Sequence, residues 1–206
     1  MVTAMAIKEI EESCKRRYKV NEKRIVAIIV ARYDIPNCRQ MIEKNYTFWH
    51  SRTGKALDFF WLGYGSYNFH IEKGQYLVGD YENEPHVFFD SEAFCRGIED
   101  IERLANFHYD DSIGILLCSY RDESLYLNES TYFEIESLMQ AESQQKLREF
   151  TSSLIKECKH SRDITYVTMK LRVKKMSYGL LNIKFSDFVS TGIRELLRYY
   201  FNDYIS

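Results

Sequence analysis

Cys38 is a candidate reactive thiol because of the residues that precede it. Ile35-Pro36-Asn37 interrupts an apolar run, and proline suits the first turn of a helix, so Cys38 is expected near a helix N-terminus. The helix dipole can lower the pKa of a thiol in that position and favour the thiolate. The alternative is a small buried residue on the first helical turn, which is the commoner role of a free cysteine.

Two aspartates are candidate ligand-binding residues because of where they lie between predicted elements. Asp34 and Asp90 each follow a predicted strand and precede a predicted helix. Ligands gather at the carboxyl ends of strands in parallel α/β sheets, and two carboxylates there could hold a magnesium ion. The alternative, which we favour, is that both are turn or N-cap residues, because nothing in the sequence shows that the two strands are neighbours.

The segment after residue 62 is unusually aromatic and contains two closely spaced glycines. Gly63-Tyr64-Gly65 follows a predicted strand as a nucleotide-binding loop would, but Asn68 stands where G-x-G-x-x-G needs its third glycine, so we expect a turn. Aromatic residues are enriched in interfaces and ligand pockets, and they are equally ordinary sheet residues. The segment, with Tyr64 and Tyr67 as its candidate binding residues, is the best place to look for a partner surface. Its aromatic residues are Tyr64, Tyr67, Phe69, Tyr76 and Tyr81.

Metal and cofactor sites receive no support from residue spacing. The five cysteines are scattered without a C-x-x-C pair, and the five histidines show no H-x-x-x-H or H-E-x-x-H spacing. We therefore expect no metal and no cofactor. An odd, dispersed set of cysteines without an export signal indicates reduced thiols and a cytoplasmic protein.

Composition and charge narrow the classes of partner. The N-terminal residues lack the pattern of a signal peptide, and no apolar run approaches the roughly 18 residues that span a bilayer. The formal net charge of −2 lacks the basic excess that is usual in nucleic-acid and membrane-surface proteins. We expect neither nucleic acid nor membrane as a partner. A protein partner or a second copy of the chain is the remaining expectation.

The elements that must position these residues follow from apolar patterns. The continuous β-branched run 25–30 predicts a strand buried on both faces, and a helix over 36–51 leads to a second central strand over 55–63. Further predicted strands cover 69–71, 75–78, 113–119 and 125–128, with Gly74 in a turn. A helix is predicted from Asp90 or Ser91 to 105, and a T-x-x-E match at Thr131 and Glu134 predicts a helix to about 158.

The last third of the sequence shows a period-two pattern. Apolar residues at 167, 169, 171 and 173 alternate with polar ones, and 181–185 repeats the alternation after Gly179. The pattern predicts a β-hairpin, followed by an amphipathic helix from Asp187 to about 203. We therefore predict one α/β domain over 1–206, with a three-layer architecture and a mixed central sheet that carries helices on both faces. It comprises an N-terminal helix in 1–23, a core over 24–158, and a hairpin and helix over 159–206 packed on the core.

The order of elements over 24–158 resembles the thioredoxin-like fold. The order is strand, helix, strand, helix, strand, strand, helix, and Ile35-Pro36-Asn37-Cys38 stands where that family carries C-P-x-C between its first strand and helix. Ile35 occupies the place of the attacking cysteine, and no proline precedes the 113–119 strand, where the family usually has a cis-proline. Thiol–disulfide exchange needs both thiols. The resemblance therefore implies the fold without the redox activity.

Two functions follow as hypotheses. The first is a non-catalytic protein-interaction or assembly module on a degenerate thioredoxin-like scaffold, because no complete catalytic motif is present. The second is an α/β enzyme or a small-ligand or nucleotide-binding protein that uses Asp34 and Asp90 at the ends of strands. The sequence favours the first, and it argues against a thiol–disulfide oxidoreductase.

Overall fold

A computed structural model describes residues 5–50, 56–67, 74–78, 86–105, 107–139, 144–178 and 182–185. The helices are α1 (Ile7–Arg17), α2 (Pro36–His50), α3 (Ser91–Ala105), α4 (Glu136–Met139), α5 (Gln144–His160) and α6 (Ile164–Tyr178). The strands are β1 (Arg24–Val30), β2 (Asp58–Trp61), β3 (Tyr64–Tyr67), β4 (Gln75–Val78), β5 (His86–Asp90), β6 (Gly114–Arg121), β7 (Ser124–Glu134) and β8 (Asn182–Phe185). Within the described residues no helix is both long and apolar enough to cross a membrane.

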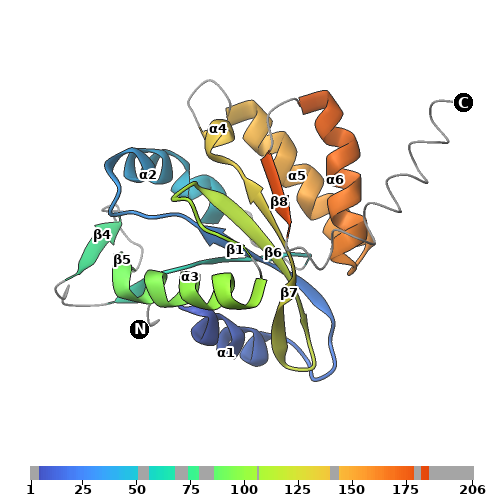
Figure 1. Ribbon diagram of the computed structural model, residues 1–206, viewed down its shortest axis with the longest axis horizontal. Helices are drawn as coiled ribbons and strands as arrows, with labels where there is room; N and C mark the ends of the chain where they lie inside the picture. The colour runs from blue at the N-terminus through green and yellow to red at the C-terminus, as the bar shows by residue number, and fades with distance from the viewer. Residues whose placement is uncertain are drawn as a thin grey trace, which may run out of the picture.

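The predicted α/β class with a mixed central sheet is confirmed. The described strands form a sheet in the order β2-β1-β6-β7-β8, and a second, smaller sheet in the order β3-β5-β4. Helices α1 and α3 lie on one side of the larger sheet, and α2, α5 and α6 lie on the other (Figure 1). The three layers enclose a core that extends from Ile10 on α1 to Leu154 on α5, both of which are fully buried.

Strand β1 is the centre of the core, as its apolar run predicts. Its residues from Ile25 to Val30 are at most 1% exposed, because helices cover both faces of the sheet. It pairs in parallel with β2, with Val26 opposite Asp58, and antiparallel with β6, with Arg24 opposite Tyr120. Helix α2 makes the crossover between the parallel pair, as predicted.

Gly63 joins the larger sheet to the smaller one. Its φ of +80° belongs to the left-handed region, which favours glycine. Its N–H donates to the carbonyl oxygen of Met5 at 2.8 Å, and its carbonyl oxygen accepts the N–H of Asp90 at 2.8 Å. The chain can therefore leave β2, turn, and enter β3, while the segment before α1 covers the outer side of β3.

The helix predicted from the T-x-x-E match at Thr131 is wrong in its first part. Thr131 and Glu134 belong to β7, which pairs with β6, and the helices α4 and α5 begin only afterwards. Tyr132 and Phe133 are at most 1% exposed, so extended backbone places one large side chain on each face of the sheet. This burial outweighs the local capping pattern, which is worth about 1 kcal/mol.

The C-terminal β-hairpin is also wrong in its first strand, because residues 164–178 form helix α6. The buried side chains are Ile164, Val167, Thr168 and Leu171, which is helical spacing. Thr168, which the period-two pattern assigns to solvent, is fully buried, and its hydroxyl donates to that of Thr131 at 3.3 Å.

Several other strand predictions are confirmed and some lie outside the described residues. Gln75–Val78 is β4, next to Gly74 with a φ of +91°, and residues 182–185 form β8, which pairs with β7. The strand predicted over 69–71 and the helix predicted from Asp187 lie outside the described residues.

Candidate functional site

The candidate site lies at the carboxyl end of β1, where the first turn of α2, the start of β3 and strand β4 meet. We call this region the β1-end surface and define it by the residues that lie there: Arg32, Tyr33, Asp34, Cys38, Arg39, Glu43, Tyr64, Tyr76, Asp111 and Glu136, together with Leu77, the residue after Tyr76 on β4. The sequence singled out Asp34, Cys38 and Tyr64, and the structure brings these three into one neighbourhood: Cys38 and Asp34 both act electrostatically on the Tyr64 hydroxyl.

Asp34 forms an ion pair with Arg32. Nε of Arg32 donates to Oδ1 of Asp34 at 3.1 Å, and Nη2 donates to Oδ2 at 2.6 Å. Nη1 of the same guanidinium donates to Oδ1 of Asp111 at 3.0 Å. The hydrogen bonds that Arg32 donates to Asp34, followed by the one it donates to Asp111, hold the pKa of Arg32 above its ordinary value. Asp34 is thus a turn residue that already has a cationic partner.

Cys38 lies in the first turn of α2, as predicted, and it is only 4% exposed. Burial raises the pKa of its thiol to about 11, and the negative charges of Glu136, Asp111 and Asp34 add to the effect. The expected influence of the helix dipole is therefore outweighed by desolvation and by neighbouring carboxylates. The thiol is protonated at neutral pH.

Tyr64 is a buried structural residue at the start of β3. Its hydroxyl donates to the carbonyl oxygen of Ala31 at 3.1 Å, which ties β3 to the end of β1. Its ring lies 5.1 Å from that of Trp61 and 5.0 Å from that of Phe89. The backbone of Tyr67 pairs with His86 in the smaller sheet, and the side chain of Tyr67 lies outside the described residues.

Asp90 caps helix α3. Its Oδ1 accepts the N–H of Ala93 at 2.9 Å, and its Oδ2 accepts Nε2 of Gln75 at 3.1 Å. Asp90 ends a strand of the smaller sheet, whereas Asp34 follows a strand of the larger one. Both carboxylates thus have their own protein partners. Among the described residues, no group of three or more His, Cys, Asp or Glu side chains could hold a metal ion.

Arg39 is one of the residues of this surface that sequence reasoning missed, which also include Arg32, Tyr33, Glu43, Leu77 and Asp111. Its guanidinium carbon lies 5.0 Å from the ring centroid of Tyr33 and 5.8 Å from that of Tyr76, and its Nε donates to the carbonyl oxygen of Tyr33 at 3.2 Å. The hydroxyl of Tyr33 donates to Oε1 of Glu43 at 2.5 Å. Arg39 thereby links α2 to β4. The sequence indicated only the aromatic segment that contains Tyr76. The contact between Arg39 and Tyr76 depends on how the smaller sheet packs against α2, which no local pattern shows.

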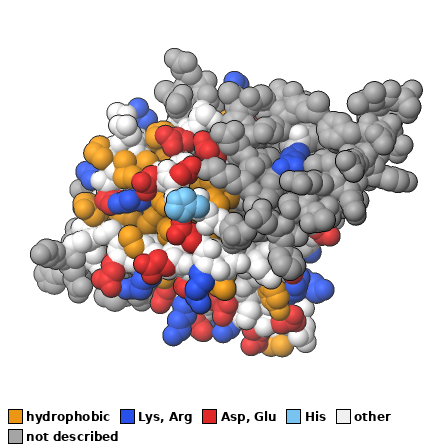
Figure 2. All heavy atoms as spheres, in the orientation of Figure 1, with side chains coloured by type: hydrophobic (Ala, Val, Ile, Leu, Met, Phe, Trp, Pro, Cys, Tyr) orange, Lys and Arg blue, Asp and Glu red, His pale blue; other side chains and the backbone are white. Residues whose placement is uncertain are grey.

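Two consecutive side chains of β4 remain exposed, and the first of them, Tyr76, contacts Arg39. Tyr76 is 37% exposed and Leu77 is 38% exposed. Figure 2 shows hydrophobic side chains gathered on the face over α2, β4 and β5, with Asp and Glu side chains among and around them. Contiguous apolar surface with a charged border is typical of a binding surface.

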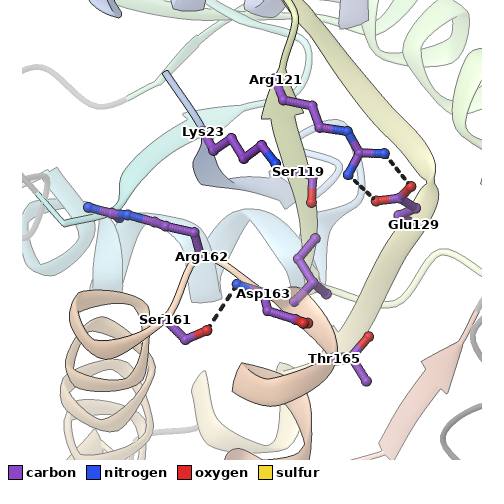
Figure 3. A pocket seen from close by; sticks show the side chains of 9 residues that line it. Lys23, Ser119, Arg121, Glu129, Ser161, Arg162, Asp163 and Thr165 are labelled. Carbon is purple, nitrogen blue, oxygen red and sulfur yellow. Dashed lines mark hydrogen bonds and ion pairs between the residues drawn. The ribbon is translucent and has the colours of Figure 1, made fainter. Parts of the chain in front are cut away.

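A second feature is a polar pocket of about 510 Å³ at the opposite end of β1 (Figure 3). It lies between the ends of β6 and β7 and the turn from α5 to α6, and it is lined by Lys23, Ser119, Arg121, Glu129, Ser161, Arg162, Asp163, Ile164 and Thr165.

Most charged groups of the pocket are held by protein partners. Arg121 and Glu129 form a bidentate ion pair at 2.9 and 2.5 Å, and Asp163 caps α6 by accepting the N–H of Tyr166. Nη1 of Arg162 donates to the carbonyl oxygens of Ala56 and Cys158, and its side chain points away from the Arg121–Glu129 pair (Figure 3). The pocket offers mainly Lys23 and hydroxyl groups to a ligand.

Comparisons with protein-family models, with curated proteins and with solved structures found no match.

The cysteines differ in exposure, which predicts their reactivity. Cys95 is exposed, whereas Cys14, Cys38, Cys118 and Cys158 are buried. We expect one cysteine of the native chain to react rapidly with Ellman's reagent near pH 8, and all five to react in denaturant. Cys95→Ser should remove the rapid phase, and Cys38→Ser should leave it. A rapid phase that disappears in Cys38→Ser would show that the Cys38 thiol is accessible and reactive.

Proposed function

We propose that this chain is a non-catalytic protein-interaction or assembly module on a degenerate thioredoxin-like scaffold. The observation that carries the proposal is the β1-end surface, where Arg39 is stacked on Tyr33 and on the exposed ring of Tyr76.

The scaffold part of the proposal is supported by strand directions. The order β2-β1-β6-β7, with β1 and β2 parallel and the next two pairs antiparallel, agrees with the element order on which the resemblance depends. Helix α2 makes the first crossover and carries Cys38 in its first turn. Strands β3, β4 and β5 are an insertion relative to that order, and they supply the aromatic half of the surface.

The non-catalytic part is supported by the environment of Cys38. Ile35 replaces the attacking cysteine, and the remaining thiol is buried with a pKa raised to about 11. Thiol–disulfide exchange requires an accessible thiolate and a second thiol to resolve the mixed disulfide. The alternative of ligand binding through strand-end carboxylates has less support, because Asp34 and Asp90 are occupied by Arg32 and by the start of α3.

The interaction part is supported by residue chemistry. Tyrosine and arginine are enriched in protein interfaces and dominate their binding energy, since they combine apolar area with hydrogen-bonding groups. Arg39 is held by a main-chain carbonyl and by two rings, so little conformational freedom remains to be lost when a partner binds.

Site-specific photo-crosslinking tests this proposal without assumptions about the partner. A benzophenone amino acid would replace Leu77 on the β1-end surface or, as a control, Tyr166 on α6, because both positions are 38% exposed. In cells that express the chain, we expect discrete adducts from position 77 that are absent from position 166, and weaker adducts when Tyr76→Ala is added. Identical adducts from both positions, or turnover in an insulin-disulfide reduction assay, would contradict the proposal.

A further inference from the structure

The β1-end surface has an excess of negative charge. The charged groups that act on the Cys38 thiol are Glu136, Asp111, Asp34 and Arg32, so three carboxylates accompany one guanidinium. Glu43 and Arg39 both contact Tyr33, and they add one negative and one positive charge. These six residues therefore carry a formal charge of −2, which equals the net charge of the whole chain. A partner with positive charge would be favoured here and steered towards this end.

Strand β4 gives the surface an outer edge. Among the described strands, β4 lies at one side of the smaller sheet and pairs only with β5, with Tyr76 opposite Phe89 and Leu77 opposite Phe88. The other side of that sheet is covered, since the N–H of Met5 donates to the carbonyl oxygen of Tyr64 at 3.1 Å. An outer strand presents main-chain groups to which an extended peptide can add.

Arg39 connects this edge to the carboxylates. It contacts the ring of Tyr76 on β4 and the main chain of Tyr33, whose neighbours in sequence are Arg32 and Asp34. A segment that lies along β4 therefore passes beside the apolar side chain of Leu77 and within the field of the carboxylates at the end of β1. Leu77 and Tyr76 are consecutive strand residues and lie on opposite faces of β4, so a segment added to its edge contacts both faces.

We propose that the β1-end surface binds an extended, basic segment of a partner protein, which adds to the outer edge of β4. Alternate apolar side chains of that segment pack beside Leu77 on one face of the sheet. Its Lys or Arg side chains point to the other face, beside Tyr76, within the net negative field of Asp34, Glu43 and Asp111. This inference rests on the proposed interaction function and names the chemical class of its partner.

Three synthetic peptides test the proposal by fluorescence anisotropy with the full chain. The basic strand peptide has alternating lysine and valine, the second peptide has glutamate in place of each lysine, and the third has a central proline in place of valine. We expect the basic peptide to bind about tenfold more tightly than either of the others, because charge and strand pairing each contribute on the order of 1.4 kcal/mol. Its affinity should fall at high salt.

Matched variants locate the site. Leu77→Ala should weaken binding of the basic peptide about fivefold or more, whereas Leu104→Ala, at another exposed leucine, should not. Asp111→Asn should weaken it about threefold and reduce its salt dependence. Asp122→Asn is the control, because Asp122 lies in the β6–β7 turn at the far end of β6. The two positions are matched in backbone conformation: φ is 62° at Asp111 and 50° at Asp122, and asparagine tolerates such positive values. The exposure of all four side chains makes loss of folding an implausible cause, and a thermal melt of each variant checks this.

Four outcomes would overturn the inference. The first is equal binding of the acidic and basic peptides, and the second is equal effects of Leu77→Ala and Leu104→Ala. The third is concentration-dependent dimerisation that Leu77→Ala abolishes, because a second copy would then occupy the surface. Crosslinked partners at position 77 that lack a basic extended segment would refute this inference and leave the proposed interaction function in place.

Discussion

Gly63→Ala is expected to lower the free energy of unfolding by about 2–5 kcal/mol. A left-handed conformation costs a residue with a side chain about 1–2 kcal/mol, and Gly63 has a φ of +80°. A Cβ atom added there would lie 2.7 Å from Cβ of Phe94 and 2.9 Å from Cε2 of Phe89, so the buried neighbours must move as well. Such overpacking costs about 1–3 kcal/mol.

Gly74→Ala is the matched control for this prediction. Gly74 also has a positive φ, of +91°, but the nearest atom to an added Cβ would be the hydroxyl of Ser91 at 3.8 Å. Only the backbone strain remains, so the expected loss is about 1–2 kcal/mol. Urea unfolding followed by circular dichroism measures both values. Equal losses at the two positions would show that the junction between the sheets has room for a side chain.

The largest expected effect of solution conditions is a loss of stability above about pH 9. Burial raises the pKa of Cys38 to about 11 and those of Cys14 and Cys158 to about 12, and it raises the pKa of Cys118 further. In the unfolded chain these thiols ionise near their ordinary pKa of 9.0. Below that pH both states keep the protons, so the thiols add no pH dependence.

Above that pH the unfolded chain loses protons that the native chain retains, so the free energy of unfolding falls as pH rises. Each buried thiol contributes a slope of up to about 1.4 kcal/mol per pH unit until its native pKa is reached. Four such thiols give a slope of about 5 kcal/mol per unit, and typical domains are stable by only about 5–15 kcal/mol. We therefore expect the native state to be lost between about pH 10 and pH 11.

Urea midpoints measured from about pH 8 upwards test this expectation. Between about pH 9 and pH 10, Cys118→Val should reduce the slope by about a quarter, because one of the four buried thiols is removed. At higher pH, tyrosines whose pKa is also raised by burial, such as Tyr18 and Tyr109, add to the slope. Cys95→Ser is the control and should leave the slope unchanged, since Cys95 is exposed. Stability that is constant to about pH 10 would show that the buried thiols do not control the alkaline limit.

Local sequence patterns were sufficient where one periodicity had no competitor. The β-branched run of β1 could only be a strand buried on both faces, and Pro36 then marked the start of α2, which is long enough to make a parallel crossover to β2. The amphipathic pattern of α3 after Asp90 was equally clear. These elements alone place Asp34 and Cys38 at the carboxyl end of β1.

Two patterns were ambiguous because a polar residue was buried. Thr168 lies between the apolar residues 167 and 169, so the period-two pattern places it on the solvent side of a strand. Its hydroxyl instead contacts that of Thr131 inside the core, and Thr168 belongs with Val167 to the buried side of helix α6. Thr131 itself matched a helix cap and instead occupies the strand opposite Leu117. Only the packing partner decides whether such a hydroxyl faces solvent, and the partner is distant in sequence.

The sequence by itself determined the buried central strand β1, the crossover that leads from it to β2, and the position of Cys38 at a helix start, because all three depend on residues that are neighbours along the chain. The predicted central place of the second strand was wrong, since among the described strands β2 lies at the outer side of the larger sheet. The tertiary structure alone decided the chemistry of the site. The pKa of Cys38 depends on burial and on Glu136 and Asp111, and the exposed surface depends on Arg39 meeting Tyr76. Desolvation and ring contacts arise between segments that only folding brings together, so no local pattern could contain them.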